Sequence, residues 1–171
     1  PNGVKAFAKQ LVLMFSLGDD AARFSVVSFA RNATTRVPWS YDQVEIEAGI
    51  DSMTADGPTS ISDGFELARQ LFEDDGNGTR SDVKRIVLFL SDGEQTVDKA
   101  ANRTLAQTAI DAAQRVKDLP ATVFAWGFGE RVSNDTLRQI ATDPSNANPN
   151  TVLLEADVAA LRAYLSLLEA A

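Results

Sequence analysis

Hydrophobic residues follow helical spacing in some stretches of the chain and form short apolar runs in others. Val4, Phe7, Leu11 and Phe15 recur every three or four positions, which predicts an amphipathic helix at the start of the chain. The same spacing predicts further helices over residues 41–53, 61–72, 105–116, 133–140 and 157–170. Within these, Ser133 and Asp157 are expected to be the N-caps of the last two helices.

Runs rich in β-branched and aromatic residues alternate with these helices. Residues 86–90 form a continuous apolar run, which predicts a parallel strand buried on both faces. Residues 23–30 and 34–39 predict a hairpin, and Pro38 places its second strand at the sheet edge because proline cannot donate to a ladder. Residues 121–128 and 151–154 predict two more strands, the latter after a loop over residues 143–150.

Alternating strands and helices predict an α/β fold. We expect a doubly wound, mostly parallel sheet with one antiparallel edge strand and helices on both faces. A length of 171 residues suits one domain. A doubly wound domain ordinarily begins with a central strand, whereas this chain begins with a helix. We therefore expect residues 1–171 to form a single domain that is incomplete at its N-terminal side and lacks one central strand.

The composition narrows the classes of function. The net charge of −8 and the pI of about 4.5 argue against nucleic acid as a partner, since phosphate binding needs clustered Lys and Arg. The sequence has no His and no Cys, which removes the commonest general base and all thiolate chemistry. No Ser-His-Asp set or phosphate loop is visible, so we expect no enzyme. No apolar run reaches about 18 residues, so direct membrane insertion is not expected.

Two polar loops carry the candidate chemistry. Residues 57–60 (Gly-Pro-Thr-Ser) precede a predicted helix, and residues 91–94 (Ser-Asp-Gly-Glu) end the buried apolar run. A carboxylate and a hydroxyl that meet at the carboxyl ends of parallel strands suit a hard divalent cation. We therefore expect Thr59 and Asp92 to be metal ligands. Two simpler alternatives stay open: Thr59 begins the helix as its N-cap, and Asp92 belongs only to a turn.

Five segments, in the same order along the chain, resemble a von Willebrand factor type A domain, the fold shared with integrin inserted domains. They are residues 1–7, 24–29, 57–64, 86–93 and 124–129. The family's metal ion-dependent adhesion site (MIDAS) uses an Asp-x-Ser-x-Ser loop, a Thr and an Asp. Thr59 and Asp92 match the second and third parts. The Asp-x-Ser-x-Ser loop and its strand are not found within residues 1–171, and the family pattern would place them immediately before Pro1.

The resemblance implies a non-enzymatic, metal-dependent adhesion domain that binds an acidic residue of a partner protein. The cofactor would be a divalent cation, with magnesium as first choice and manganese or calcium as alternatives. The partner would be a protein ligand or neighbouring domains of a larger protein, contacted by a rim that includes Asp56, Ser60 and Glu94. One alternative is a structural building block of an extracellular matrix or filament assembly without a working metal site. A weaker one is an intracellular partner of a chelatase or ATPase machine.

Four Asn-x-Ser/Thr triplets lie in predicted turns or near helix starts, where a glycan could be accommodated. They indicate an extracellular or cell-surface protein of the secretory pathway. The candidate glycosylation sites are Asn32, Asn77, Asn102 and Asn134.

Overall fold

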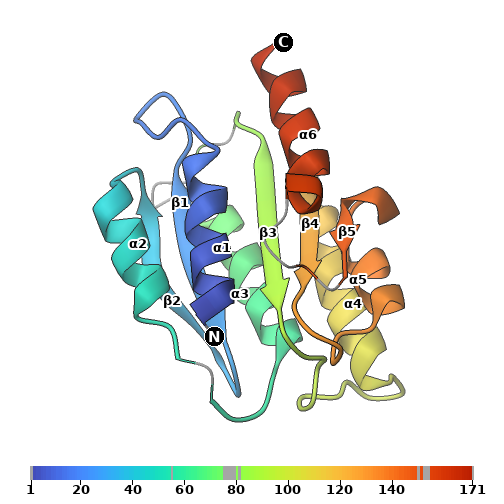
Figure 1. Ribbon diagram of the computed structural model, residues 1–171. Coiled ribbons are helices and arrows are strands. Elements are labelled where there is room, and N and C mark those ends of the chain that lie inside the picture. The colour runs from blue at the N-terminus through green and yellow to red at the C-terminus, as the bar shows by residue number, and fades with distance from the viewer. Residues whose placement is uncertain are drawn as a thin grey trace.

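Helices and strands alternate along the computed structural model, which describes residues 2–54, 56–74, 80, 82–149, 151 and 155–170 (Figure 1). The elements are α1 (Asn2–Leu13), β1 (Phe24–Phe29), β2 (Ala33–Ser40), α2 (Gln43–Asp51), α3 (Ile61–Glu73), β3 (Arg85–Ser91), α4 (Leu105–Lys117), β4 (Ala121–Gly127), α5 (Asn134–Ile140), β5 (Ala147–Asn148) and α6 (Ala159–Glu169). Two short 3₁₀ helices, Pro144–Asn146 and Glu155–Val158, flank β5 and precede α6. The predicted helices and the α/β class are confirmed.

The strands form two separate hydrogen-bonded groups. β1 pairs with β2 in an antiparallel hairpin, from Phe24 opposite Ser40 to Phe29 opposite Ala33. β3 pairs in parallel with β4, and β4 pairs in parallel with the short β5. In the part of the chain that the structure describes, no ladder joins β1 to β3. The antiparallel edge strand that Pro38 predicts is therefore present as β2, whereas the sheet is interrupted in its middle.

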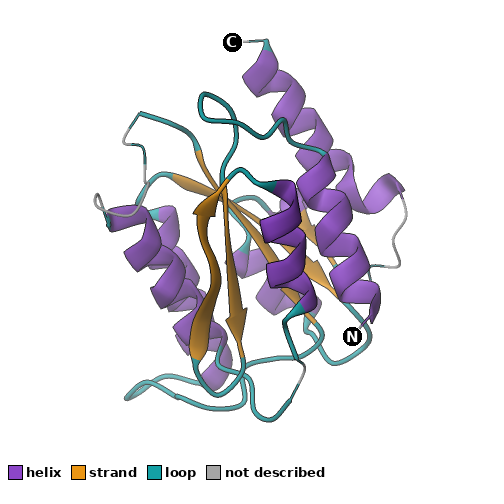
Figure 2. Ribbon diagram, turned by 90° about the vertical axis from the view of Figure 1, so that its left-hand side faces the viewer, coloured by secondary structure: helices purple, strands orange, loops and turns teal. Residues whose placement is uncertain are grey.

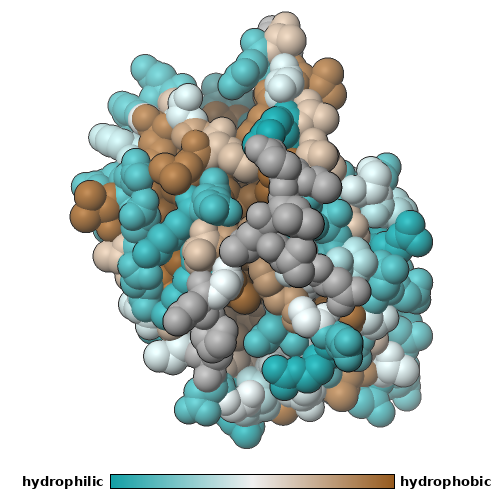
Figure 3. All heavy atoms as spheres, in the orientation of Figure 1, coloured by the Kyte–Doolittle hydropathy of each residue, from teal (hydrophilic) through white to brown (hydrophobic). Residues whose placement is uncertain are grey.

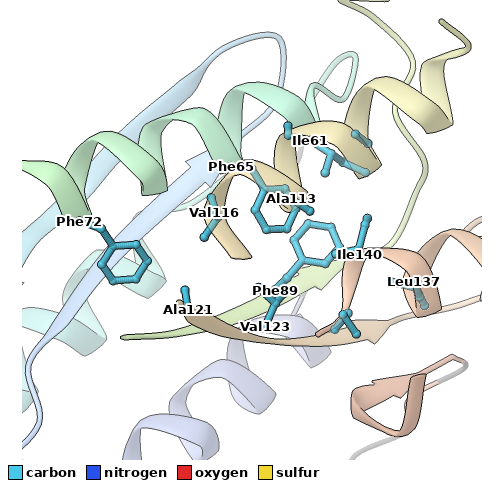
Figure 4. Close-up of a cluster of buried hydrophobic side chains, with 14 residues drawn as sticks. Ile61, Phe65, Phe72, Phe89, Ala113, Val116, Ala121, Val123, Leu137 and Ile140 are labelled. Carbon is cyan, nitrogen blue, oxygen red and sulfur yellow. The ribbon is translucent and has the colours of Figure 1, made fainter. Parts of the chain in front are cut away.

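Helices cover both faces of the strands (Figure 2). On one face, α3, α4 and α5 pack on β3 and β4, with Phe65, Phe89 and Val116 in the same buried cluster (Figure 4). On the other face, Phe7 of α1 and Leu161 of α6 pack against Trp126 of β4. The Phe7 and Trp126 rings meet edge to face, with 5.5 Å between their centroids. The helices on the two faces thus fix the positions of β3 and β4.

Side-chain caps explain where several helices begin. The Asp42 carboxylate accepts from the first turn of α2, and the Thr104 hydroxyl forms a capping box with Gln107 at the start of α4. Ser133 caps α5 by accepting from the Thr136 N–H, which confirms the helix that the sequence predicts there. These side chains accept hydrogen bonds from backbone N–H groups that have no partner within the helix, and they therefore fix where α2, α4 and α5 begin.

The C-terminal part differs from the sequence-based expectation in two respects. β5 lies inside the predicted loop over residues 143–150, because Asp143 accepts from the Ser145 N–H and turns the chain so that Ala147 comes alongside Ala125. The predicted strand over residues 151–154 is not observed at Thr151, and residues 152–154 lie outside the described residues. The prediction that Asp157 caps α6 is wrong. A 3₁₀ turn precedes that helix, and the N-cap residue is Val158, which makes no side-chain capping bond.

Candidate functional site

The loops that follow β1 and β3 are tied to the same segment of chain. The Thr59 N–H donates to Thr96 Oγ1 over 2.8 Å, and the Thr96 N–H donates to the Thr59 carbonyl over 2.8 Å. The next residue, Ser60, donates its N–H to the carbonyl of Ala30, directly after β1, over 2.7 Å. The carboxyl ends of β1 and β3 therefore lie at one rim of the molecule, at the lower edge of Figure 1.

Thr59 and Asp92 both line a groove of about 1030 Å³ that runs between β1 and β3. Asp92 is exposed, and its Oδ2 lies 3.9 Å from Nη2 of the exposed Arg131. Thr59 is half-buried and is not the N-cap of α3, because Ser60 takes that position. The N-cap alternative for Thr59 is therefore wrong, and its side chain stays available for another role.

Ser60 does not belong to an accessible rim. Its side chain is 0% exposed, and its hydroxyl accepts from the Asp63 N–H over 3.4 Å. The same hydroxyl lies 3.3 Å from that of Ser62. Because the cap is buried beneath the loop, Ser60 positions the start of α3 and is shielded from a partner protein.

The other two residues expected at the rim, Asp56 and Glu94, also line the groove. Asp56 is exposed beside Gly57, whose φ of +77° favours glycine at this turn. Glu94 is half-buried, and its Oε1 accepts from the Ser133 N–H over 3.0 Å. Glu94 therefore links the β3 loop to the start of α5, while Asp56 stays exposed to solvent.

A buried glutamine, which sequence reasoning did not single out, connects the loop after β3 to the first turn of α3. Gln95 is 4% exposed; its Oε1 accepts from the Ser62 N–H and its Nε2 donates to the Ser62 hydroxyl, both over 2.8 Å. A buried amide with both ends bonded fixes the distance between the groups that it joins. The only available signal in the sequence was its position, three residues after Asp92.

Asp63 lies in the first turn of α3. Burial raises the pKa of this carboxyl, the negative charge of Asp98 raises it further, and the hydrogen bond with Ser60 opposes the shift. Asp63 is thus a second carboxyl group near the rim, in addition to the expected ligand Asp92.

The donor chemistry at the rim suits a hydrated hard cation. A hydroxyl and a carboxylate are oxygen ligands, and Mg²⁺ commonly keeps several waters while it uses one or two carboxylates. Among the described residues, no group of three or more His, Cys, Asp or Glu side chains is arranged to hold a metal. Thr59 and Asp92 thus fit such an ion in kind, and they would form only part of its ligand shell.

The candidate glycosylation sites lie in different settings. Asn32, Asn102 and Asn134 are exposed, and Asn77 lies outside the described residues. Thr136, the hydroxyl residue of the last triplet, is 7% exposed within α5. In the described part of the chain, the helices are too short or too polar to cross a bilayer.

Comparisons with known proteins agree with this architecture. The model of the von Willebrand factor type A domain family matches residues 2–165. Matrilin-1 of Mus musculus is 24% identical over 155 residues, which are 87% of this chain and 29% of matrilin-1. The collagen alpha-4(VI) chain of Mus musculus is 27% identical over 143 residues, 81% of this chain and 6% of that protein. The chain thus spans less than a third of the length of either relative.

Solved structures share the fold. Proximal thread matrix protein 1 from the mussel byssus superimposes with a TM-score of 0.78 at 25% identity, over 98% of this chain and 42% of that one. The same byssus protein has a structure with a zinc-occupied MIDAS motif, at 24% identity. The von Willebrand factor domain of the type V pili tip protein Mfa5 from Porphyromonas gingivalis gives a TM-score of 0.79 at 12% identity, over 97% of this chain and 88% of that one.

Proposed function

Because the chain belongs to the von Willebrand factor type A domain family, we propose that it is a non-enzymatic adhesion or matrix domain. Its binding surface would be the rim at the carboxyl ends of β1 and β3. The observation that carries this proposal is the pair of Thr59–Thr96 hydrogen bonds, which holds the Thr59 loop beside the loop of Asp92. The likeness to a byssus thread matrix protein and to matrilin-1 supports the same class of function.

The finer proposal is cation-dependent binding of an acidic residue. Thr59 and Asp92 would hold a divalent cation, with magnesium as first choice and manganese or calcium as alternatives, together with water and further oxygen ligands from outside residues 1–171. The cation would supply a positive centre for a partner's carboxylate. Asp92 contributes the negative charge that attracts the cation, and Arg131 lies 3.9 Å from that carboxylate, where it also attracts an acidic partner. Asp56 would extend the rim.

The test uses a library of extended peptides that each carry one central Glu, with a matched library in which Gln replaces it. Binding to the immobilised protein is measured with Mg²⁺, with Mn²⁺ and in excess EDTA. We expect a subset of Glu peptides to bind with either cation and to lose binding in EDTA, while their Gln counterparts do not bind. Equal binding of Glu peptides in EDTA would contradict the cation-dependent mechanism.

A matched pair of variants tests whether cation-dependent binding takes place at Asp92. Asp92→Asn removes the carboxylate at the rim and should abolish cation-dependent binding. Asp82→Asn makes the same change at an exposed position before β3 and should leave binding intact. Equal loss in both variants would indicate a general charge effect and would contradict the role of Asp92.

A structural building block is the second candidate. It is favoured by the small number of metal donors at the rim in the described residues and by the matrix-type relatives. This role predicts self-association that is the same in Mg²⁺ and in EDTA, measured by sedimentation velocity. An extracellular location is proposed for both functions, and glycans on the exposed Asn32 or Asn102 would support it.

A further inference from the structure

The sequence contains four Asp-Gly pairs, and the structure places three of them in different surroundings. These are Asp56–Gly57 in the loop before α3, Asp63–Gly64 within α3 and Asp92–Gly93 after β3; the fourth, Asp75–Gly76, lies outside the described residues. In such a pair the glycine nitrogen can attack the aspartate side chain, because glycine has no Cβ to shield its nitrogen. The pairs share this chemistry, so their surroundings decide which of them reacts.

The reaction rearranges the backbone and needs no reactant other than water. A bond forms between the glycine nitrogen and the aspartate Cγ, and the carboxyl hydroxyl leaves with the amide proton as water, which gives a five-membered succinimide ring. Water then breaks the bond between the aspartate carbonyl carbon and that nitrogen. The product is isoaspartate, which has one more methylene in the backbone, a free α-carboxylate and unchanged mass. The attack therefore requires a free glycine N–H and a carboxyl group that can turn toward it.

The pair Asp56–Gly57 meets both requirements. Asp56 is exposed, and within the described residues neither its carboxylate nor the Gly57 N–H has a hydrogen-bond or ion-pair partner. A Cβ added to Gly57 would meet no atom within 4 Å, so open space surrounds this position. The loop is the lowest part of the molecule in Figure 1, and the surface there is mostly teal and white in Figure 3, hence hydrophilic. Water can therefore reach the pair.

The pair Asp63–Gly64 is held in a helix. The Gly64 N–H donates to the Ser60 carbonyl over 3.4 Å in the first turn of α3. Gly64 is also buried against Phe29, whose ring lies 3.0 Å from the position that a Cβ on Gly64 would take. The nitrogen cannot turn toward the Asp63 carboxyl without loss of this hydrogen bond and of the packing. The fold therefore protects this pair.

The pair Asp92–Gly93 is held by Ser91. The Gly93 N–H donates to the Ser91 hydroxyl oxygen over 3.3 Å, and the Ser91 hydroxyl donates to the Gly93 carbonyl over 2.6 Å. Ser91 is 6% exposed and is the last residue of β3, so it fixes this turn to the sheet. Although Asp92 is exposed, the nitrogen that would attack it is bonded. This pair should therefore react more slowly than Asp56–Gly57.

We propose that Asp56–Gly57 is a site of spontaneous isoaspartate formation, and that α3 and Ser91 protect the other two described pairs from the same reaction. The modification adds a methylene to the segment that leads to Thr59, and it moves the carboxylate at position 56 one carbon closer to the backbone. The rim therefore changes with the age of the protein. An effect on partner binding rests on the proposed function of the rim, whereas the modification itself does not.

The test follows isoaspartate in the folded chain over several weeks at neutral pH and body temperature, in excess EDTA so that no cation holds Asp92. Tryptic peptides are analysed by mass spectrometry with electron-transfer fragmentation, which distinguishes isoaspartate from aspartate at each position. We expect isoaspartate to accumulate about tenfold faster at Asp56 than at Asp63 or Asp92 because local structure restricts the latter two. Absence of isoaspartate at Asp56, or similar rates at the three positions, would overturn the proposal.

A parallel sample unfolded in urea is the control for local sequence. Without the fold, none of the three pairs is protected, and their rates of isoaspartate formation should become similar. A tenfold excess at Asp56 that persists in urea would overturn the proposal, because the neighbouring residues in the sequence would then set the rate.

Two variants test the chemistry and the protection separately. Asp56→Glu should abolish the modification at this position, because the side chain would have to close a less favourable six-membered ring. Ser91→Ala removes the hydroxyl that holds Gly93 and should raise the rate at Asp92 several-fold, with the rate at Asp56 unchanged. An unchanged rate at Asp92, or an equal increase at both positions, would overturn the protective role of Ser91. Neither readout involves partner binding, so failure of the proposed function would leave both outcomes unchanged.

Discussion

Thr59 and Thr96 are 37 residues apart in the sequence and are joined by hydrogen bonds that include one from each backbone N–H. The Thr59 N–H reaches the Thr96 hydroxyl, and the Thr96 N–H reaches the Thr59 carbonyl. This pair makes one rim from the segment before α3 and the loop after β3. The position of Asp92 relative to Thr59 depends on it.

Replacing the Thr96 hydroxyl should loosen the rim. Thr96→Val keeps the shape of the side chain and removes the acceptor for the Thr59 N–H. We expect a loss of about 1 kcal/mol in the free energy of unfolding, measured by urea denaturation. Thr34→Val, an exposed β2 position, is the control and should change stability by less than about 0.5 kcal/mol. Equal stability of Thr96→Val and the unmodified chain would contradict the importance of this link.

Gln95 should be more sensitive than Thr96 because it is buried. Gln95→Leu leaves the Ser62 N–H and hydroxyl without their amide partners inside the fold. An unsatisfied buried polar group costs about 1–3 kcal/mol, and we expect a destabilisation in that range by urea denaturation. Gln10→Leu, an exposed position of α1, is the matched control. An unchanged free energy of unfolding in Gln95→Leu would contradict this prediction.

Glu66 should make stability depend on pH. The hydrogen bond from Arg69 lowers the pKa of the Glu66 carboxyl; burial opposes this, while Gln70 and the positive charges of Arg69 and Arg115 lower the pKa further. Because the folded-state pKa is below its ordinary value, the carboxylate stabilises the fold at neutral pH, and this contribution is lost as the pH falls through the folded pKa.

The variant Glu66→Gln tests this dependence. Its melting temperature should be lower than that of the unmodified protein at neutral pH. The corresponding loss in the free energy of unfolding should be no more than about 1 kcal/mol, because the ion pairs are partly exposed. The difference should vanish in acid, where the Glu66 carboxyl of the unmodified protein is protonated and, like the amide of the variant, carries no charge. Glu169→Gln, at an exposed position of α6, is the control. A difference that persists unchanged in acid would show that Glu66 acts through packing.

The periodic and apolar patterns predicted most of the fold. The stripe of Ile61, Phe65 and Phe72 predicted α3, and the run Ile86–Leu90 predicted β3, because both segments bury apolar surface against fixed neighbours. β5 could not be predicted in the same way. Its two residues, Ala147 and Asn148, pair with β4 because of a turn at Asp143, and neither residue type favours a strand.

The candidate site was harder to predict than the fold. The sequence placed Thr59 in a loop before a helix and Asp92 in a loop at the end of a strand, and both residues line one groove in the structure. It could not predict that Ser60 is the buried cap of α3 or that Gln95 joins the loop after β3 to α3, because these roles depend on contacts between distant segments. The ligand role of Thr59 and Asp92 remains a prediction.

The most direct test of the central claim is paramagnetic line broadening of backbone amide signals during a Mn²⁺ titration, which detects even weak cation binding. If Thr59 and Asp92 hold the cation, signals of residues 56–60 and 91–96 should broaden first, and Asp92→Asn should remove the effect while Asp82→Asn preserves it. Broadening centred instead on the acidic residues Glu73 and Asp74, or broadening that is unchanged in Asp92→Asn, would contradict the account.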